Sequence, residues 1–284
     1  MDYIEYTNEV DNLSESFEDR LLDTFEISDK AEEHIYIHED STMKWGCIKN
    51  FYKDPVAVRE FLQKFPIVPQ NVTHSPGLQQ HFPVPTMTSL STVYDYLHSM
   101  LMKYRYPVVD QSYPDWQIYC NTHWKHMEIY ESSMVPHTDP FSYAFNIWLT
   151  DDNPAGTEFY YYQKDNIYPA YFLEAFARAE PYKCADFTRD VLHRKEDYTI
   201  KWDPDKIDTW FSERGWHKYL TMEPEYNSCT FYPSIFFHKP EWDSRKYKED
   251  LLRYSQVISY RAFDPHQFEN IWDNYKNLED FKVQ

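Results

Sequence analysis

His137 and Asp139 form a His-x-Asp triplet, and His238 ends a later strand-like segment. An extended backbone places both side chains of such a triplet on one side, because side chains of a strand alternate with a period of two. A second histidine on a neighbouring strand would complete one face of an octahedral ion. Two neutral imidazoles and a carboxylate suit Fe(II) and leave positions open for an oxidant and a chelating substrate. His137, Asp139 and His238 are therefore the candidate catalytic and metal-binding residues.

The triplet itself is uninformative. With 12 histidines and 47 acidic residues among 284, about two His-x-Asp/Glu triplets arise by chance. The sequence contains three, at residues 38–40, 126–128 and 137–139. We treat the first two as chance occurrences, because only the third directly precedes a predicted hairpin that is followed, further along, by a strand ending in His238.

A possible carboxylate-binding pair opens the last predicted strand. Arg253 and Ser255 are two residues apart, so a strand places them on the same face. The guanidinium offers parallel donors in a fixed fork, a geometry that lysine cannot copy, and the hydroxyl adds a further donor. Lys246, Lys248 and Arg261 are alternative anchors. We favour Arg253 because it begins a strand, whereas the lysines lie in a charged loop and Arg261 lies near the far end of the strand.

Each of these residues also has a simpler explanation. His137 could cap a turn, Asp139 could be a turn residue before a proline, and His238 could be a core histidine with satisfied hydrogen bonds. Arg253 could form an ordinary surface ion pair. The order of the residues along the chain, rather than any one of them, favours the metal site.

Two helices are predicted before the strands begin. Residues 50–66 have Asp54 as a possible N-cap and Pro55 in the first turn. Residues 91–104 have helical spacing as well. The predicted buried stripes are Val58, Phe61, Leu62 and Phe65 in the first helix, and Val93, Leu97, Met100 and Leu101 in the second.

The periodicity changes to two from about residue 115. Residues 116–131 are rich in aromatic and branched side chains and predict one or two strands. Residues 141–150 alternate as in a half-buried strand, and 151–156 have the composition of a turn. Residues 157–162 are then expected to return as the partner strand of a hairpin. Two further strands are predicted at 227–238 and 253–263.

Residues 163–225 interrupt this pattern. Two pieces, residues 169–180 and 208–220, have helical character, so we expect a helical insertion here. A long aromatic insertion could be a lid or substrate wall, or it could be surface decoration, and the sequence does not decide between these.

Composition indicates a globular protein, with 42% hydrophobic and 19% aromatic residues. The sequence has neither a membrane-length apolar run nor the pattern of a signal peptide, so a cytoplasmic location without membrane association is expected. The four cysteines form no Cys-x-x-Cys pair and are expected to be buried free thiols. A net charge of −19 disfavours nucleic acid as a partner.

Much of the negative charge lies in residues 1–40, which have 14 acidic residues against Arg20 and Lys30, a net charge of −12. An apolar residue recurs there every four positions, which predicts a short amphipathic helix packed on the body of the protein. A dedicated partner-binding arm is the alternative. The apolar positions are Leu13, Phe17, Leu21 and Phe25.

Taken together, the order His-x-Asp, hairpin, distal histidine and Arg-x-Ser resembles the Fe(II)/2-oxoglutarate-dependent dioxygenase superfamily, including its prolyl-hydroxylase-like branch. The resemblance covers roughly residues 115–265. It implies a mainly β fold of the α+β class, with a double-stranded β-helix (jelly-roll) core, flanking helices and the helical insertion. The intervals from His137 to His238 and from His238 to Arg253 are longer than is usual in this family, and the insertion would explain the first.

The resemblance also implies roles for individual residues. His137, Asp139 and His238 would bind Fe(II), while Arg253 and Ser255 would hold the distal carboxylate of 2-oxoglutarate. Tyr130 matches a family position that often hydrogen-bonds the same carboxylate. The implied reaction uses O2 and 2-oxoglutarate to hydroxylate a small molecule or an amino-acid side chain of a peptide, with release of succinate and CO2.

Four segments follow from these expectations. They are an acidic N-terminal arm (1–44), a helical scaffold packed on the core (45–114), the oxygenase core (115–265, with its insertion) and a C-terminal helical tail (266–284). Two other functions are compatible with the same residues. One is a non-catalytic jelly-roll binding or scaffold protein that uses the acidic arm, and the other is a cupin-like metalloenzyme without 2-oxoglutarate. A nucleic-acid demethylase of the same superfamily is disfavoured by the acidic chain.

Overall fold

The protein is mainly β. The computed structural model describes residues 24–37, 44–63, 68–69, 78–80, 91–104, 115–121, 136–138, 143–151, 156–163, 206–234, 236–241 and 253–260. Within these ranges, two antiparallel sheets are accompanied by three helices. Among the same residues, none of the helices is long and apolar enough to cross a membrane.

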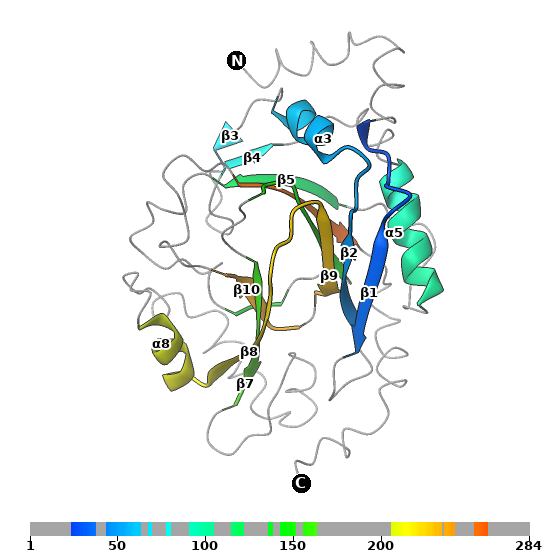
Figure 1. Cartoon of the computed structure of the whole chain (residues 1–284). Helices are drawn as coiled ribbons and strands as arrows, with labels where there is room; N and C mark the ends of the chain where they lie inside the picture. Colours follow the sequence, from blue (N-terminus) through cyan, green and yellow to red (C-terminus); the bar gives the residue numbers. More distant parts are fainter. Residues whose placement is uncertain are drawn as a thin grey trace.

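The larger sheet has eight strands in the order β1-β2-β9-β6-β11-β5-β4-β3 (Figure 1). Each strand is antiparallel to its neighbours. The strand bounds are β1 Glu32–Ile37, β2 Lys44–Lys49, β3 Val68–Pro69, β4 Leu78–Gln80, β5 Asp115–Asn121, β6 Tyr143–Trp148, β9 Ser228–Pro233 and β11 Arg253–Tyr260.

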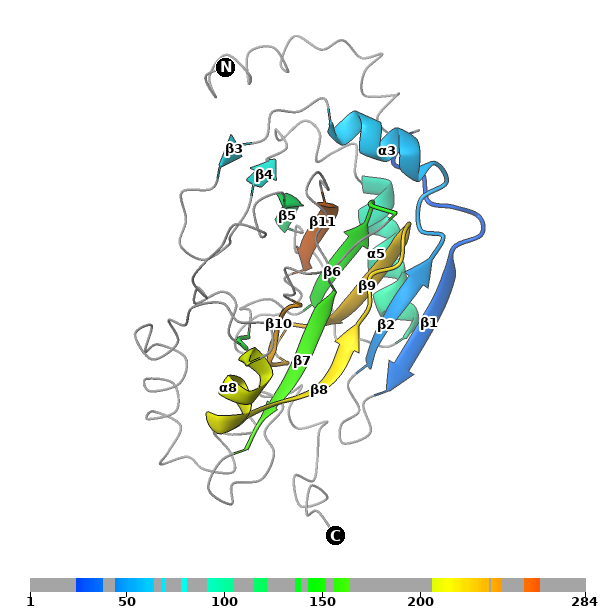
Figure 2. The same cartoon turned by 60° about the vertical axis from the view of Figure 1, so that its left-hand side comes forward.

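The smaller sheet has three strands in the order β10-β7-β8. They are β7 Thr157–Tyr162, β8 Trp216–Met222 and β10 His238–Pro240. On its other side, β10 forms a single antiparallel bridge with His137. Helix α8, Ile207–Glu213, lies beside this sheet (Figure 2).

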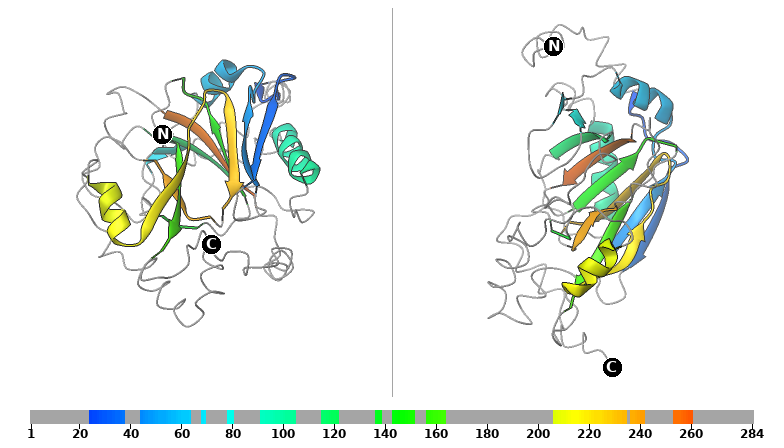
Figure 3. Two further views of the ribbon diagram at one scale, coloured as in Figure 1. Left: turned by 60° about the horizontal axis from the view of Figure 1, so that its bottom comes forward. Right: turned by 90° about the vertical axis from the view of Figure 1, so that its left-hand side faces the viewer.

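Helix α3, Pro55–Leu62, begins where the sequence predicts, because the Asp54 side chain accepts a hydrogen bond of 2.9 Å from the backbone N–H of Ala57. Helix α5, Ser91–Lys103, also matches its prediction. It lies beside β1 and β2 (Figure 3). The described residues of both predicted stripes are buried: Val58, Phe61, Leu62, Val93, Leu97, Met100 and Leu101.

One face of the larger sheet packs against these helices. Phe145 of β6, Phe231 of β9 and Ile258 of β11 belong to the same apolar core as the helical stripes. Phe25, the last apolar position of the N-terminal pattern, is fully buried there against Tyr52 and Phe61. Phe25 thus packs on the body as predicted, whereas Leu13, Phe17 and Leu21 lie outside the described residues.

The opposite face of the larger sheet is buried but polar. It includes Asn146, Thr230 and Ser255, and the indole Nε1 of Trp148 donates a 3.0 Å hydrogen bond to Thr230 Oγ1. Tyr232, two residues after Thr230, extends this face towards the smaller sheet. All six residues of β6 are buried, so the prediction of a half-buried strand was wrong. The smaller sheet lies over the face that alternation alone would assign to solvent.

The prediction of a hairpin between residues 141 and 162 was also wrong. Strand β6 pairs with β9 and β11, whereas β7 pairs with β8 and β10, so consecutive strands lie in different sheets. The turn-like segment between them therefore connects two sheets. A hairpin and a connection between two sheets have the same local alternation and turn composition. They differ only in which distant strands pair with the two strands that they join.

Strands also occur where helix or arm was expected. Strand β1 lies in the predicted acidic arm, β2 in the predicted helical scaffold and β8 in the predicted helical insertion. The negative charge of β1 is matched locally, because Glu33 accepts hydrogen bonds from Lys103 Nζ at 2.6 Å and from the Tyr104 hydroxyl at 2.7 Å. The four segment boundaries themselves stay predictions.

Candidate metal centre

His137 and His238 are direct partners across the bridge beside β10. The backbone N–H of each residue donates to the carbonyl of the other, at 2.9 Å in both directions. Their imidazole rings lie with centroids 4.8 Å apart and planes tilted by 48°. The structure thus brings together two predicted ligands that are a hundred residues apart in sequence.

The tautomer of His238 is fixed by a backbone carbonyl. Its Nδ1 lies 2.8 Å from the carbonyl oxygen of Phe236. A carbonyl can only accept, so Nδ1 carries the proton and the lone pair of the neutral ring lies on Nε2. Histidine ligands of metals commonly have this arrangement, because the second nitrogen's hydrogen bond fixes the ring orientation.

Aromatic rings surround His238, whose exposed fraction is 4%. The ring of Tyr232 meets the imidazole edge-on with a centroid distance of 4.9 Å, and Phe159 lies 6.4 Å away. Tyr232 comes from the larger sheet and Phe159 from the smaller one. His238 therefore lies between the two sheets, whereas His137 is only partly buried.

Strand β11 carries the predicted carboxylate-binding residues. It begins at Arg253, as predicted, with Arg253 opposite Asn121 of β5. Ser255 has an exposed fraction of 2% and lies opposite Trp148 of β6, which places it on the buried polar face. The position of the Arg253 side chain is outside the described part of the chain.

Several predicted residues lie outside the described ranges. The third candidate iron ligand, Asp139, is one of them, and so is Tyr130. The alternative anchors Lys246, Lys248 and Arg261 are also outside. Within the described ranges, no group of three His, Cys, Asp or Glu side chains could hold a metal ion.

Cys47 and Cys229 have described side chains, and both are free thiols. The prediction of buried free thiols is confirmed for Cys229. Cys229 is fully buried, and burial raises the pKa of its thiol well above the usual value. Cys47 is less buried, although burial raises its pKa as well. At neutral pH both thiols are therefore protonated, which is their less nucleophilic form.

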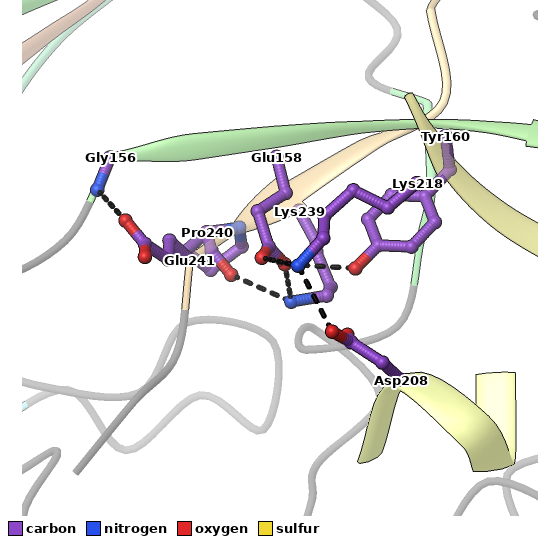
Figure 4. A network of polar contacts seen from close by, with 8 residues as sticks. All are labelled: Gly156, Glu158, Tyr160, Asp208, Lys218, Lys239, Pro240 and Glu241. Carbon is purple, nitrogen blue, oxygen red and sulfur yellow. Dashed lines mark hydrogen bonds and ion pairs between the residues drawn. The ribbon is translucent and has the colours of Figure 1, made fainter. Parts of the chain in front are cut away.

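A buried ionic network on the smaller sheet was missed by the sequence reasoning (Figure 4). Lys239, with an exposed fraction of 2%, pairs with Glu158, with an exposed fraction of 5%. Glu158 also binds Lys218 Nζ at 2.9 Å and the Tyr160 hydroxyl at 2.8 Å. Lys218 in turn pairs with Asp208 of α8 at 3.1 Å.

The network lies on the face of the smaller sheet opposite the ring of His238. Lys239 follows His238 directly, so strand alternation directs it to the opposite face of the sheet from the imidazole. A sequence signal existed at Glu158, which is the charged residue of a mostly aromatic strand segment. Only the register of β7 and β10, which pairs Glu158 with Lys239, shows that the two charges meet.

The network should make stability depend on pH. Burial by itself raises the pKa of the Glu158 carboxyl, but Lys239 and Lys218 outweigh burial, and the pKa lies below its usual value of 4.5. Such a carboxylate stabilises the fold at pH above its unfolded pKa, and this contribution is lost as pH falls through the folded pKa. We expect the unfolding free energy, measured in denaturant, to decrease below pH 4.5.

Glu158→Gln isolates the contribution of this group. The variant should be less stable than wild type at pH 7 and should lose less stability as the pH is lowered, because its amide does not titrate. Parallel stability curves for the two proteins would show that Glu158 is not the group responsible.

Comparisons with known proteins identify little. No protein-family model matches the sequence, and no curated protein matches it. Among solved structures, the non-heme alpha-ketoglutarate-dependent carbocyclase SnoK from nogalamycin biosynthesis is weakly similar. The identity is 10% and the TM-score 0.24, over 92% of this chain and 83% of SnoK. At that score the similarity establishes neither fold nor function, which have to be argued from the residues of this protein.

Proposed function

We propose that this protein is an Fe(II)- and 2-oxoglutarate-dependent oxygenase that hydroxylates a small molecule or an amino-acid side chain of a peptide, releasing succinate and CO2. The observation that carries the proposal is the pairing of His137 with His238. Their backbones are joined by two hydrogen bonds, and their rings lie 4.8 Å apart. Because Nδ1 of His238 is hydrogen-bonded to the Phe236 carbonyl, Nε2 is the nitrogen that would bind the metal.

The strand order supports a jelly-roll core. Among the described residues from 115 onward, eight segments follow one another: β5, the bridge at His137, then β6 to β11. The first pairs with the eighth, the second with the seventh, the third with the sixth and the fourth with the fifth. This nesting is that of one antiparallel ribbon rolled into two sheets, as in a double-stranded β-helix.

The residues present fit Fe(II). His137 and His238 would supply two imidazoles, and Asp139 would supply the carboxylate from the segment that begins at His137. When bound, iron would activate O2 for oxidation of a C–H bond. The carbonyl of Phe236 would keep His238 in the ligating tautomer, and the ring of Tyr232 would hold its orientation.

The buried polar face of the larger sheet suits a polar cosubstrate. Ser255 places a hydroxyl there, close to the start of β11, where Arg253 lies. In this proposal the Arg253 guanidinium holds the distal carboxylate of 2-oxoglutarate, with Ser255 and Tyr130 as further donors. Residues of the 163–225 segment would contribute to the substrate-binding side.

Iron and 2-oxoglutarate binding can be measured directly. Anaerobic addition of Fe(II) and 2-oxoglutarate to the wild-type protein should give the weak visible charge-transfer band of the chelate. With air, the protein should form succinate slowly even without substrate. Asp139→Ala should lose both signals, because one of three metal ligands is removed. A wild-type protein that binds neither ligand would exclude the proposal.

Arg253→Ala distinguishes the related possibilities. It should weaken 2-oxoglutarate binding by about 10-fold or more while Fe(II) affinity stays the same, since hydrogen bonds to charged groups contribute about 1.5–3 kcal/mol. Metal binding without any effect of this change on 2-oxoglutarate would instead indicate a cupin-like metalloenzyme. A function lost on deletion of residues 1–40 but retained in His238→Ala would indicate a scaffold protein.

A further inference from the structure

We infer that Lys239, through its buried ion pair with Glu158, is a positioning residue for the metal ligand His238. This inference rests on the proposed function, because it treats His238 as a ligand. Lys239 itself would touch neither metal nor substrate. It would act through the backbone of β10, to which both residues belong.

Strand β10 is short. It is three residues long, and its last residue, Pro240, has no N–H to donate. On one side it pairs with β7, and on the other, among the described residues, it has a bridge with His137. Side-chain anchors on so short a strand would help to keep the ring of His238 in one position.

Lys239 provides such an anchor. It lies opposite Glu158 in register, and its ammonium pairs with that carboxylate and approaches the Pro240 carbonyl at 3.3 Å. The same ammonium lies 5.5 Å from the ring centroid of Tyr160 and 5.7 Å from that of Phe211. An ammonium enclosed in this way cannot leave its partner without losing both charge compensation and cation–π contacts, so β10 is fixed against β7.

A second anchor lies just after β10, two residues beyond Lys239. The Glu241 carboxylate accepts a 3.0 Å hydrogen bond from the Gly156 N–H, and the Glu241 N–H donates to the Gly156 carbonyl at 2.9 Å. Gly156 is closely packed, since a Cβ there would lie 2.0 Å from the carbonyl oxygen of Met222. Lys239 in β10 and Glu241 just after it thus hold this segment on the side opposite the His238 ring.

Lys218, the second lysine of the network, provides a control that distinguishes an effect on the position of His238 from an effect on overall stability. Lys218 binds the same carboxylate of Glu158 but comes from β8, which is not next to β10. Without Lys239, Glu158 would keep Lys218 and the Tyr160 hydroxyl. The particular effect of Lys239 is therefore to join the strand of His238 to β7, and Lys218→Met is a matched control.

The experiment compares Lys239→Met with Lys218→Met in the full-length protein. Co(II) is titrated anaerobically into each variant, and the dissociation constant is obtained from the ligand-field absorption bands. Lys239→Met should bind Co(II) about 10–100-fold more weakly than wild type, as expected when a residue that orients a ligand is lost. Lys218→Met should stay within about 3-fold. Equal affinities for both variants would overturn the inference.

A metal-free measurement tests the same idea. Long-range 1H–15N spectra of the apo protein report which nitrogen of His238 is protonated. Wild type and Lys218→Met should show the Nδ1-protonated ring, and Lys239→Met should show a mixture of tautomers. If wild type binds no Co(II), the proposed function fails, whereas the spectra still report the positioning. An unchanged His238 spectrum in Lys239→Met would count against a positioning role for Lys239.

The double variant Glu158→Leu/Lys239→Met covers the case in which Lys239→Met does not fold. It removes both buried charges and leaves apolar side chains of similar size, so folding should be retained. Co(II) binding should still be about 10-fold weaker than in wild type, because the anchor is missing. Wild-type affinity in the double variant would contradict a positioning role.

Discussion

His238→Ala is expected to lower the affinity for Fe(II), or for Co(II) in its place, by at least about 100-fold, because loss of a residue that merely orients a ligand already costs about 10–100-fold. The imidazole lies between the two sheets with its Nδ1 held by the Phe236 carbonyl, which leaves Nε2 as the nitrogen that would bind the metal. His137→Ala should have a similar effect, since the two rings lie 4.8 Å apart on paired backbones. Metal titration followed by visible absorption measures both.

Controls are needed because His238 is buried and its loss leaves a cavity. His238→Gln keeps most of the volume and should fold while binding metal poorly. His217→Ala removes a histidine of the same sheet, which stacks on Tyr161 with a centroid distance of 5.1 Å, and should leave the metal affinity unchanged. A folded His238→Ala protein with wild-type affinity would remove His238 from the site.

Glu158→Leu is expected to destabilise the protein by about 3–5 kcal/mol, because it leaves the ammonium of Lys239 buried without its counter-charge. The rings of Tyr160 and Phe211 lie near this ammonium, but they cannot neutralise its charge as a carboxylate does. Denaturant unfolding monitored by tryptophan fluorescence measures the loss. The same change leaves Lys218 with Asp208, so the outer part of the network persists.

The double variant Glu158→Leu/Lys239→Met should recover most of this loss. Replacing a buried ion pair by apolar residues of similar volume is often neutral, whereas removing one partner is costly. Asp208→Asn breaks only the exposed pair with Lys218 and should change the unfolding free energy by less than about 1 kcal/mol. If the effects of Glu158→Leu and Lys239→Met on the unfolding free energy simply add up in the double variant, Glu158 and Lys239 do not interact.

The local elements were largely predictable from the sequence. Asp54 and Pro55 marked the start of α3, and apolar spacing marked the buried sides of α3 and α5. The last strand begins at Arg253, as predicted. These features depend on capping, on the fixed φ of proline and on periodic burial, which are properties of residues close together in the chain.

Strand pairing was predicted poorly. The alternation of residues 141–150 and the turn-like composition after it indicated a hairpin, yet β6 and β7 lie in separate sheets. Strand β6 is buried on both faces, and β8 lies where helix was expected. Partners such as β11 and β9 are far away in sequence, and nothing in the local pattern of a strand specifies which distant strand will pair with it.

The sequence by itself determined which residues could do the chemistry: a His-x-Asp triplet, a distant histidine and an Arg-x-Ser pair at the start of a strand. It could not decide whether they meet, because a side chain's type and spacing do not fix its distant neighbours. The tertiary structure decided that His137 and His238 are paired through their backbones, since β10 folds back beside residue 137. It also placed Lys239 opposite Glu158, because only the register of β10 on β7 brings those two charges together.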